Sequence, residues 1–223
     1  MFFSKRFFSF GPLFLWAVSL NAETGLPPIV FTQIPVGTEI EKTIPPPGAF
    51  PRAHWKAGSR LMILFPDGRV VRLAERLFAA CDPSPSFDGK KILFSGKEKK
   101  EEPWAIYEIR CDGTGLRCIT KLDADCRSPL YQPLLFTIDA DRPWYQISFI
   151  SNAAGTLSEY GNWETYHLYS CRMDGTDLRR LTYTVDSNYD PIIMQDGREI
   201  FAFWRPPAAE RGYRPAVSIC GIN

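Results

Sequence analysis

The chain has 223 residues, of which 45% are hydrophobic and 23% charged, and its formal net charge is +1. A chain of this length is long enough for one domain with a sizeable core. Because 26 Lys and Arg residues are balanced by 25 Asp and Glu residues, the composition excludes the strong basic excess that nucleic-acid-binding domains show.

Residues 1–22 have the pattern of a secretory signal peptide. Lys5 and Arg6 precede an almost wholly apolar stretch, and Asn21-Ala22 offers a small-residue cleavage site. The apolar stretch is shorter than the about 20 residues of a membrane span, and no later segment approaches that length. We therefore expect a periplasmic or secreted protein with no membrane span after cleavage. A retained N-terminal anchor is the alternative.

Residues 23–60 predict an extended N-terminal segment with the first strands. Residues 29–32, Ile-Val-Phe-Thr, have the composition of a strand. Residues 45–48, Pro-Pro-Pro-Gly, interrupt the chain after this strand, and such a run is typical of an exposed loop.

Residues 61–223 carry an internal repeat. Residues 106–120 match residues 168–182 without a gap, and residues 61–73 form a weaker copy. Each copy consists of a hydrophobic strand, an Asp-Gly turn and a second strand. Tight hairpins need residues that tolerate positive φ, which Gly does at no steric cost and Asp more easily than most residues. Each copy therefore predicts a β-hairpin.

A second hairpin type alternates with the first. Residues 82–94 recur as residues 190–203, each beginning with Asp-Pro and turning at Asp-Gly, and residues 126–150 are a degenerate version. Two hairpins per repeat give the four strands of a propeller blade. The repeat residues to which we assign a structural role are Asp82, Pro83, Asp88, Gly89, Asp112, Gly113, Asp174, Gly175, Asp190, Pro191, Asp196 and Gly197.

The repeats predict an all-β fold, a β-propeller of four-stranded blades with little helix. Residues 219–223 fit the strand equivalent to residues 106–110, so about three and a half blades are visible, whereas closed propellers have about 4–8. Three explanations stay open: a truncated relative of a longer propeller, a propeller completed by another chain, or further strands within residues 24–60. An unclosed arc leaves strand edges uncovered, which favours a protein partner.

The pattern Asp-Pro-x-x-Ser-x-Asp-Gly-Lys-x-Ile-x-Phe of residues 82–94, together with residues 106–120, resembles the β-propeller repeat of the TolB periplasmic protein. The order of the blocks, including residues 104–109 and 203–205, is similar to exported propeller proteins grouped with the middle domain of the hydrazine synthase alpha subunit. The resemblance covers roughly residues 28–223. It implies fold and compartment alone, because such propellers serve as binding platforms, cofactor housings and enzymes alike.

No set of residues with a catalytic pattern occurs in the sequence. The hydrazine synthase relative acts through haem, and haem attachment of the c type needs Cys-x-x-Cys-His. That motif is absent, His54 and His167 are far apart in the sequence, and no Ser lies in a Gly-x-Ser-x-Gly context. The sequence therefore predicts no cofactor and no metal held by this chain.

Two further features are candidates for binding and for cross-linking. The polar insertion of residues 152–166 contains Tyr160 and Trp163, and loops on a rigid scaffold often carry recognition. Six cysteines in an exported chain permit disulfides. Cys81 and Cys126 each lie beside the start of the first hairpin of consecutive repeats, which suggests a disulfide between them, and free buried thiols are the alternative.

The leading functional hypothesis is an exported propeller that acts as a protein- or glycan-binding scaffold. The rival is a subunit or fragment of a hydrazine-synthase-like redox assembly in which another chain holds the cofactor. A decayed fragment without function is a third possibility. Under the first two hypotheses a protein partner is expected, and completion of the propeller by that partner is one of the three explanations left open above.

Overall fold

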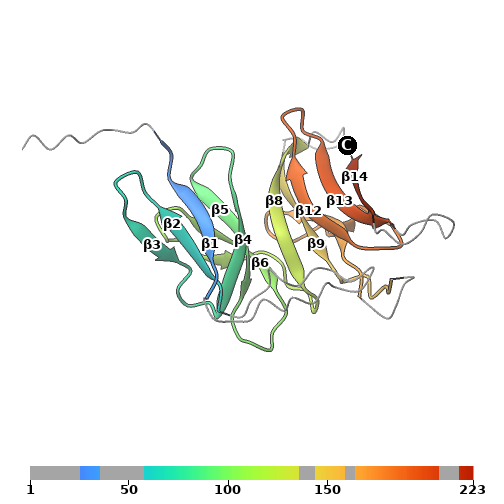
Figure 1. Ribbon diagram of the computed structural model, residues 1–223, viewed down its shortest axis with the longest axis horizontal. Helices are drawn as coiled ribbons and strands as arrows, with labels where there is room; N and C mark the ends of the chain where they lie inside the picture. The colour runs from blue at the N-terminus through green and yellow to red at the C-terminus, as the bar shows by residue number, and fades with distance from the viewer. Residues whose placement is uncertain (1–25, 36–57, 136–143, 159–163, 206–215, 223) are drawn as a thin grey trace, which may run out of the picture.

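The computed structural model describes residues 26–35, 58–135, 144–158, 164–205 and 216–222. Within these residues the chain forms fourteen β-strands in four antiparallel sheets and no helix (Figure 1). The first two sheets contain β1 (Ile29–Gln33), β2 (Arg60–Leu64) and β3 (Val70–Leu73), then β4 (Ala79–Pro85), β5 (Lys91–Lys97), β6 (Ala105–Arg110) and β7 (Arg117–Cys118). The last two contain β8 (Cys126–Leu135), β9 (Trp144–Ser151), β10 (His167–Arg172) and β11 (Arg179–Arg180), then β12 (Asn188–Ile193), β13 (Glu199–Arg205) and β14 (Ala216–Ile222).

The sheets are successive blades of a propeller arc. β4, β8 and β12 are the first strands of their sheets and contact one another in sequence. β1 and β2 lie against β4 as β5 and β6 lie against β8. The first sheet therefore corresponds to the second, third and fourth strands of a blade, and the last sheet to the first three. The expectation of about three and a half four-stranded blades is confirmed, and Figure 1 shows the first and last sheets on opposite sides of the molecule.

The predicted hairpins form because their turn residues suit the backbone geometry. Tyr107 pairs with Cys118 in one copy and Tyr169 with Arg180 in the other. Between them, Gly113 and Gly175 have φ of +84° and +83°, a region that residues with a Cβ rarely adopt. The strand expected at residues 29–32 is β1, and the strand expected near residue 219 is β14, which pairs with β13.

A bulge recurs in each first strand. Asp82, Ser128 and Asp190 each precede a proline and have φ of +53°, +48° and +41°. The pairing register of β4, β8 and β12 shifts across these residues. The Asp-Pro pairs with which the sequence repeats begin, and Ser128-Pro129 likewise, therefore lie inside their strands and not at the strand starts. Each is at a β-bulge that redirects the side chains.

The core lies between successive sheets. One cluster of buried residues joins the first two sheets, including Leu61, Ile63 and Phe94. A second joins the middle two, including Ile106 and Phe149, and a third joins the last two around Tyr166 and Phe201. Burial between blades is the main driving force for assembling such a stack, because each sheet alone leaves its apolar faces in water.

Five Asp-Gly turns gather at one end of the blades, which we call the Asp-Gly end. They connect β2 to β3, β4 to β5, β6 to β7, β10 to β11 and β12 to β13. In an antiparallel meander every second connection falls on the same side, so a repeat with two Asp-Gly turns presents both there. The turns after β2, β4 and β12 lie toward the top of Figure 1. The β5–β6 and β9–β10 connections lie at the opposite end.

None of the described residues belongs to a helix long and apolar enough to cross a membrane. The expected signal peptide, residues 1–22, and the Pro-Pro-Pro-Gly run of residues 45–48 lie outside the described residues.

Candidate functional site

A cavity of about 280 Å³ opens between the second and third sheets at the Asp-Gly end. We call it the interblade groove. The residues that define it are Phe87, Lys91, Glu108, Arg117, Tyr131 and Tyr145. They come from the β4–β5 turn, from β5, β6 and β7 of one blade, and from β8 and β9 of the next. Neither blade could form this groove alone.

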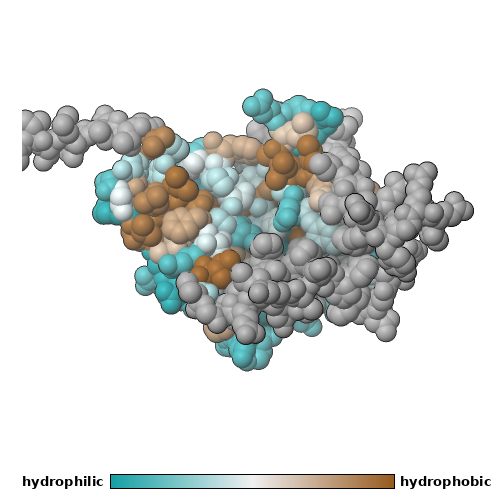
Figure 2. Space-filling model, in the orientation of Figure 1, coloured by the Kyte–Doolittle hydropathy of each residue, from teal (hydrophilic) through white to brown (hydrophobic). Residues whose placement is uncertain are grey.

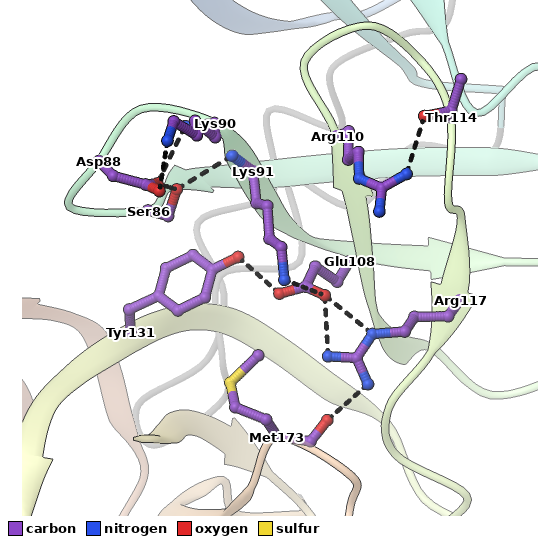
Figure 3. Close-up of polar contacts among 10 residues, drawn as sticks. All are labelled: Ser86, Asp88, Lys90, Lys91, Glu108, Arg110, Thr114, Arg117, Tyr131 and Met173. Carbon is purple, nitrogen blue, oxygen red and sulfur yellow. Dashed lines mark hydrogen bonds and ion pairs between the residues drawn. The ribbon is translucent and has the colours of Figure 1, made fainter. Parts of the chain in front are cut away.

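A buried carboxylate forms the floor of the groove (Figure 3). The Glu108 side chain is 5% exposed. Its Oε2 atom accepts hydrogen bonds from Arg117 Nε at 2.8 Å and Lys91 Nζ at 3.4 Å, and its Oε1 atom accepts one from the Tyr131 hydroxyl at 3.1 Å. Two cations and a phenol therefore neutralise and hold this carboxylate, as burial of a charge requires. Burial raises the pKa of Tyr131, which keeps its hydroxyl protonated and able to donate.

Arg117 also fixes the width of the groove, because it joins the two blades. Its Nη1 atom donates to the Met173 carbonyl oxygen of the next blade at 2.8 Å. Beside that contact, Gly175 approaches the Ile119 backbone so closely that a Cβ at Gly175 would overlap the Ile119 carbonyl oxygen. Glycine therefore suits this turn for two reasons: its φ is +83°, and the absence of a Cβ lets one blade pack on the next.

Aromatic rings form the walls. Phe87 and Tyr145 are 64% and 54% exposed, although both are large and largely apolar. A second cavity of about 390 Å³ runs along the first strands of the three blades and shares Phe87 and Tyr131 with the groove. Figure 2 shows apolar surface over β8 and β12 and a separate apolar area over the first sheet. Exposed aromatic rings beside a polar floor are typical of ligand sites.

A buried ion pair lies behind the groove and joins the same two blades. Arg127 is fully buried, and its Nε atom donates to Asp82 Oδ2 at 2.8 Å. Ser95 Oγ and Ser128 N also donate to this oxygen, at 3.0 and 3.2 Å. The Arg127 guanidinium lies 4.2 Å from the ring centre of Trp104. Burial alone would raise the pKa of Asp82, but the charge and the hydrogen bonds outweigh it and hold the pKa below its ordinary value.

The turn aspartates do not converge on a common centre. The five that precede the turn glycines each accept a hydrogen bond from the backbone N–H two residues later, at distances of 2.8–3.1 Å. Hydrogen bonds within these turns lower their pKa values. Only Asp88 lines the groove. Of the Asp-Pro residues, Asp82 with Pro83 and Asp190 with Pro191 line the second cavity.

The suggested Cys81–Cys126 disulfide is not formed, since both residues are free buried thiols. Their strand positions explain this. The backbone N–H groups of Ala80 and Cys126 make the same contact to the preceding blade, to Ser59 O and Trp104 O. Cys81 is therefore equivalent to Arg127, one residue further along. A shift of one residue turns a side chain to the other face of a strand, so the two sulfurs do not face each other.

His167 is buried and Tyr160, Trp163 and His54 lie outside the described residues. His167 Nε2 lies 2.9 Å from Thr156 Oγ1 and 3.0 Å from Thr165 Oγ1. Burial and the nearby Arg180 charge lower the pKa of His167 to about 4. The described residues contain no group of three or more His, Cys, Asp or Glu side chains that would hold a metal ion.

Sequence reasoning missed the residues of the groove floor. A usable signal exists, because Glu108 and Arg117 are directly opposite each other across the Asp112-Gly113 hairpin. Opposite charges at paired positions favour a cross-strand ion pair. The contribution of Tyr131 comes from another blade and has no local signal.

Comparison with known proteins supports the fold. The hydrazine synthase alpha subunit of Kuenenia stuttgartiensis is 27% identical over 208 residues, which cover 74% of this chain and 26% of that protein. A solved hydrazine synthase from the same organism superposes with a TM-score of 0.68 at 25% identity, over 88% of this chain and 30% of that one. The chain thus spans about a quarter of the length of the curated relative that it matches.

A solved TolB structure from Agrobacterium tumefaciens superposes with a TM-score of 0.53 at 19% identity, over 72% of this chain and 52% of that one. This likeness concerns the fold. No family model matches the chain. The resemblance to TolB-like propellers and to the hydrazine synthase alpha subunit, first visible in the repeat, is confirmed.

Proposed function

We propose that this chain is an exported propeller scaffold that binds its ligand at the Asp-Gly end, in the interblade groove. The observation that carries the proposal is the combination of exposed aromatic walls, Phe87 and Tyr145, with a rigid polar floor at a junction between blades. Such concave sites with a few fixed polar groups are the usual form of a ligand-binding pocket.

The floor suits binding better than proton transfer. Both Glu108 oxygens already accept hydrogen bonds, from Tyr131 on one side and from Lys91 and Arg117 on the other. A general base needs an oxygen or nitrogen free to take a proton from its substrate. In this groove the carboxylate instead holds two cations in place, which orients them toward a ligand.

Binding can be tested with the full chain immobilised on a sensor and exposed to panels of oligosaccharides and peptides. We expect at least one class to bind, and Phe87→Ala to weaken that binding while Phe78→Ala leaves it unchanged. Phe78 is a matched control because it is also exposed, 37%, but precedes β4 at the opposite end of the blade. Equal binding by both variants would place the ligand elsewhere and contradict the proposal.

Export is part of the same proposal and rests on the pattern of residues 1–22. When the chain is expressed in a Gram-negative bacterium, the mature protein is expected in the periplasm or the medium, with its N-terminus after Ala22 by mass spectrometry. An intact N-terminus in the cytoplasm would contradict export.

A second candidate function is a subunit of a redox assembly like hydrazine synthase, with the cofactor in another chain. The 27% identity to the alpha subunit of that enzyme favours it. Isolation of the chain from its native cells in a complex with haem absorbance would support this candidate. Isolation without other polypeptides or chromophore would contradict it.

A protein partner fits either function. The described residues place no strand beside β1 on the side away from β2, where the other blades have their first strand. Such an open strand edge is a ready site for pairing with another chain. Light scattering on the purified chain is expected to show a defined assembly, and a strictly monomeric protein would contradict a self-association partner.

A further inference from the structure

We infer that the interblade groove binds an acidic sugar residue, that is, a pyranose ring carrying a carboxylate. This inference rests on the proposed binding function and specifies its ligand. Three properties of the groove lead to it: the excess of open hydrogen-bond donors, the flat aromatic walls and the small volume.

The open polar groups on the floor of the groove are donors. Lys91 Nζ has three N–H bonds and directs one toward Glu108 at 3.4 Å. Arg117 directs Nε and Nη2 at Glu108 and one N–H of Nη1 at Met173 O, which leaves one N–H on each terminal nitrogen. The side chains of Lys91 and Arg117 are 46% and 42% exposed, so these N–H groups can reach a ligand.

Most carboxylate oxygens of the groove are already engaged, and the remaining one, Asp88 Oδ2, lies 3.9 Å from Lys90 Nζ. Glu108 accepts from Tyr131, Lys91 and Arg117. Asp88 Oδ1 accepts from Ser86 Oγ at 2.7 Å and from Lys90 N at 3.1 Å, within its own turn. The formal charges of the lining residues sum to zero, but more hydrogen-bond donors than acceptors remain open. The ligand that fits must supply acceptors, and a carboxylate forms the strongest such bonds with ammonium and guanidinium groups.

The walls and the volume indicate a single ring. Phe87 and Tyr145 expose large aromatic surfaces, which the apolar C–H face of a sugar covers well while its hydroxyl groups reach polar side chains at the edge. A cavity of about 280 Å³ lies at the small end of ligand pockets. A protein surface would need about 800 Å² on each side for stable association, so the groove by itself fits a ring better than a folded partner.

The test is isothermal titration calorimetry on the full chain with four probes: methyl galacturonoside, methyl galactoside, sodium acetate and a short Asp-rich peptide. The expected result is that the uronoside binds at least about tenfold more tightly than the neutral galactoside, because it gains charge-assisted hydrogen bonds. Acetate should bind weakly, since it has no ring to cover the aromatic walls. Raising the salt concentration should weaken uronoside binding.

Two variants separate the two parts of the site. Lys91→Gln should reduce uronoside affinity about tenfold or more and leave galactoside affinity nearly unchanged, because only the acid uses the cation. Phe87→Ala should reduce affinity for both sugars about three- to tenfold. Matched controls are Lys100→Gln and Phe78→Ala, which lie at the opposite end of the same blade and should change neither affinity. Thermal melting confirms that each variant is folded.

The outcomes distinguish this inference from the proposed function. Equal binding of uronoside and galactoside, or an unchanged uronoside affinity in Lys91→Gln, overturns the acidic-sugar inference. Tighter binding of the peptide that is lost in Phe87→Ala also overturns it, but keeps the binding function of the groove. Failure of all four probes to bind overturns the inference, and the wider panels then decide the function.

Discussion

Two junctions between neighbouring blades use the same backbone positions with different chemistry. At the junction of the second and third sheets these positions hold Asp82 and Arg127, which form a buried ion pair at 2.8 Å. At the junction of the third and fourth sheets the equivalent positions hold Ser128 and Tyr189. The bulge and the backbone contacts repeat, but the charge does not. The propeller repeat thus fixes the geometry and leaves the side chains free to differ.

The buried carboxylates show the same contrast. Glu108 contacts Tyr131 and two cations. Among the described residues, the donors to Glu199 are the neutral groups Ser148 Oγ and Gln132 Nε2, each at 2.8 Å. Tyr131 and Gln132 are neighbours on β8, and successive side chains of a strand point to opposite faces. β8 therefore supplies one hydrogen-bond donor, Tyr131, to Glu108 and another, Gln132, to Glu199. Burial raises the pKa of Glu199, whereas the cations Lys91 and Arg117 contact Glu108 at the other junction.

The largest expected effect comes from removing Arg127, the buried cation at the junction of the second and third sheets. Arg127→Met leaves the Asp82 carboxylate without its guanidinium, and breaking a buried pair costs about 3–5 kcal/mol. Urea denaturation measures the loss in the free energy of unfolding. The matched control, Arg179→Met, breaks an exposed pair with Asp177 and should change stability by less than about 0.5 kcal/mol. The double variant Asp82→Asn with Arg127→Met should recover part of the loss. Equal effects of Arg127→Met and Arg179→Met would contradict a stabilising role for the buried pair.

The next largest loss of stability is expected at Gly175, where the second and third sheets approach each other closely. Gly175→Ala places a Cβ against the Ile119 carbonyl oxygen in addition to the strain of positive φ, so we expect a loss of about 2–4 kcal/mol. Gly68→Ala has a similar φ, +86°, but open space around its Cβ, and should cost only about 1 kcal/mol. Thermal and urea unfolding of the pair measure the difference. Equal losses would show that the blades do not meet at Gly175.

Glu199, at the junction of the third and fourth sheets, should make the stability of the protein depend on pH. Its pKa in the folded protein is raised above the ordinary value of 4.5, so the stability that it contributes is fully present below pH 4.5 and is lost as the pH rises through the folded pKa. Glu199→Gln removes this loss, and at pH 7 it should raise the free energy of unfolding by about 1 kcal/mol. The same substitution should have little effect at pH 4. Destabilisation by Glu199→Gln at pH 7 would contradict the prediction, because it would mean that the surroundings favour the charged carboxylate.

His167 should change stability in the opposite direction with pH. Its pKa falls from 6.5 to about 4 on folding, so the unfolded chain binds the proton more readily between these values. Stability is therefore lost as the pH falls from 6.5 toward 4. The difference in the free energy of unfolding between wild type and His167→Asn should shrink over that range as the pH falls. A constant difference would contradict the assignment.

Local chemistry explains which features the sequence predicts. The hairpins at Asp112-Gly113 and Asp174-Gly175 arise from turn residues and strand pattern within fifteen residues or so, and β1 arises from its own composition. The Asp82–Arg127 pair joins residues that are 45 positions apart in the sequence, so no pattern of neighbouring residues predicts it. The Cys81–Cys126 hypothesis is wrong because it treats the two cysteines as equivalent positions. Aligning Pro83 with Pro129 makes Cys81 equivalent to Arg127 instead and predicts free thiols.

The candidate site is less predictable than the fold. The sequence directs attention to Tyr160 and Trp163, which lie outside the described part of the chain. The groove depends on three strands of one blade and two of the next. Its depth comes from packing between blades, which residue patterns along one strand do not encode.

Hydrogen–deuterium exchange on the full chain, with and without methyl galacturonoside, tests most directly whether the Asp-Gly end is the binding face. We predict slower exchange in peptides that cover residues 86–91, 108–117 and 173–175, with no change in the connections at residues 98–104 and 152–158. Protection confined to those two connections would contradict this prediction and would move the binding face to the opposite end of the blades.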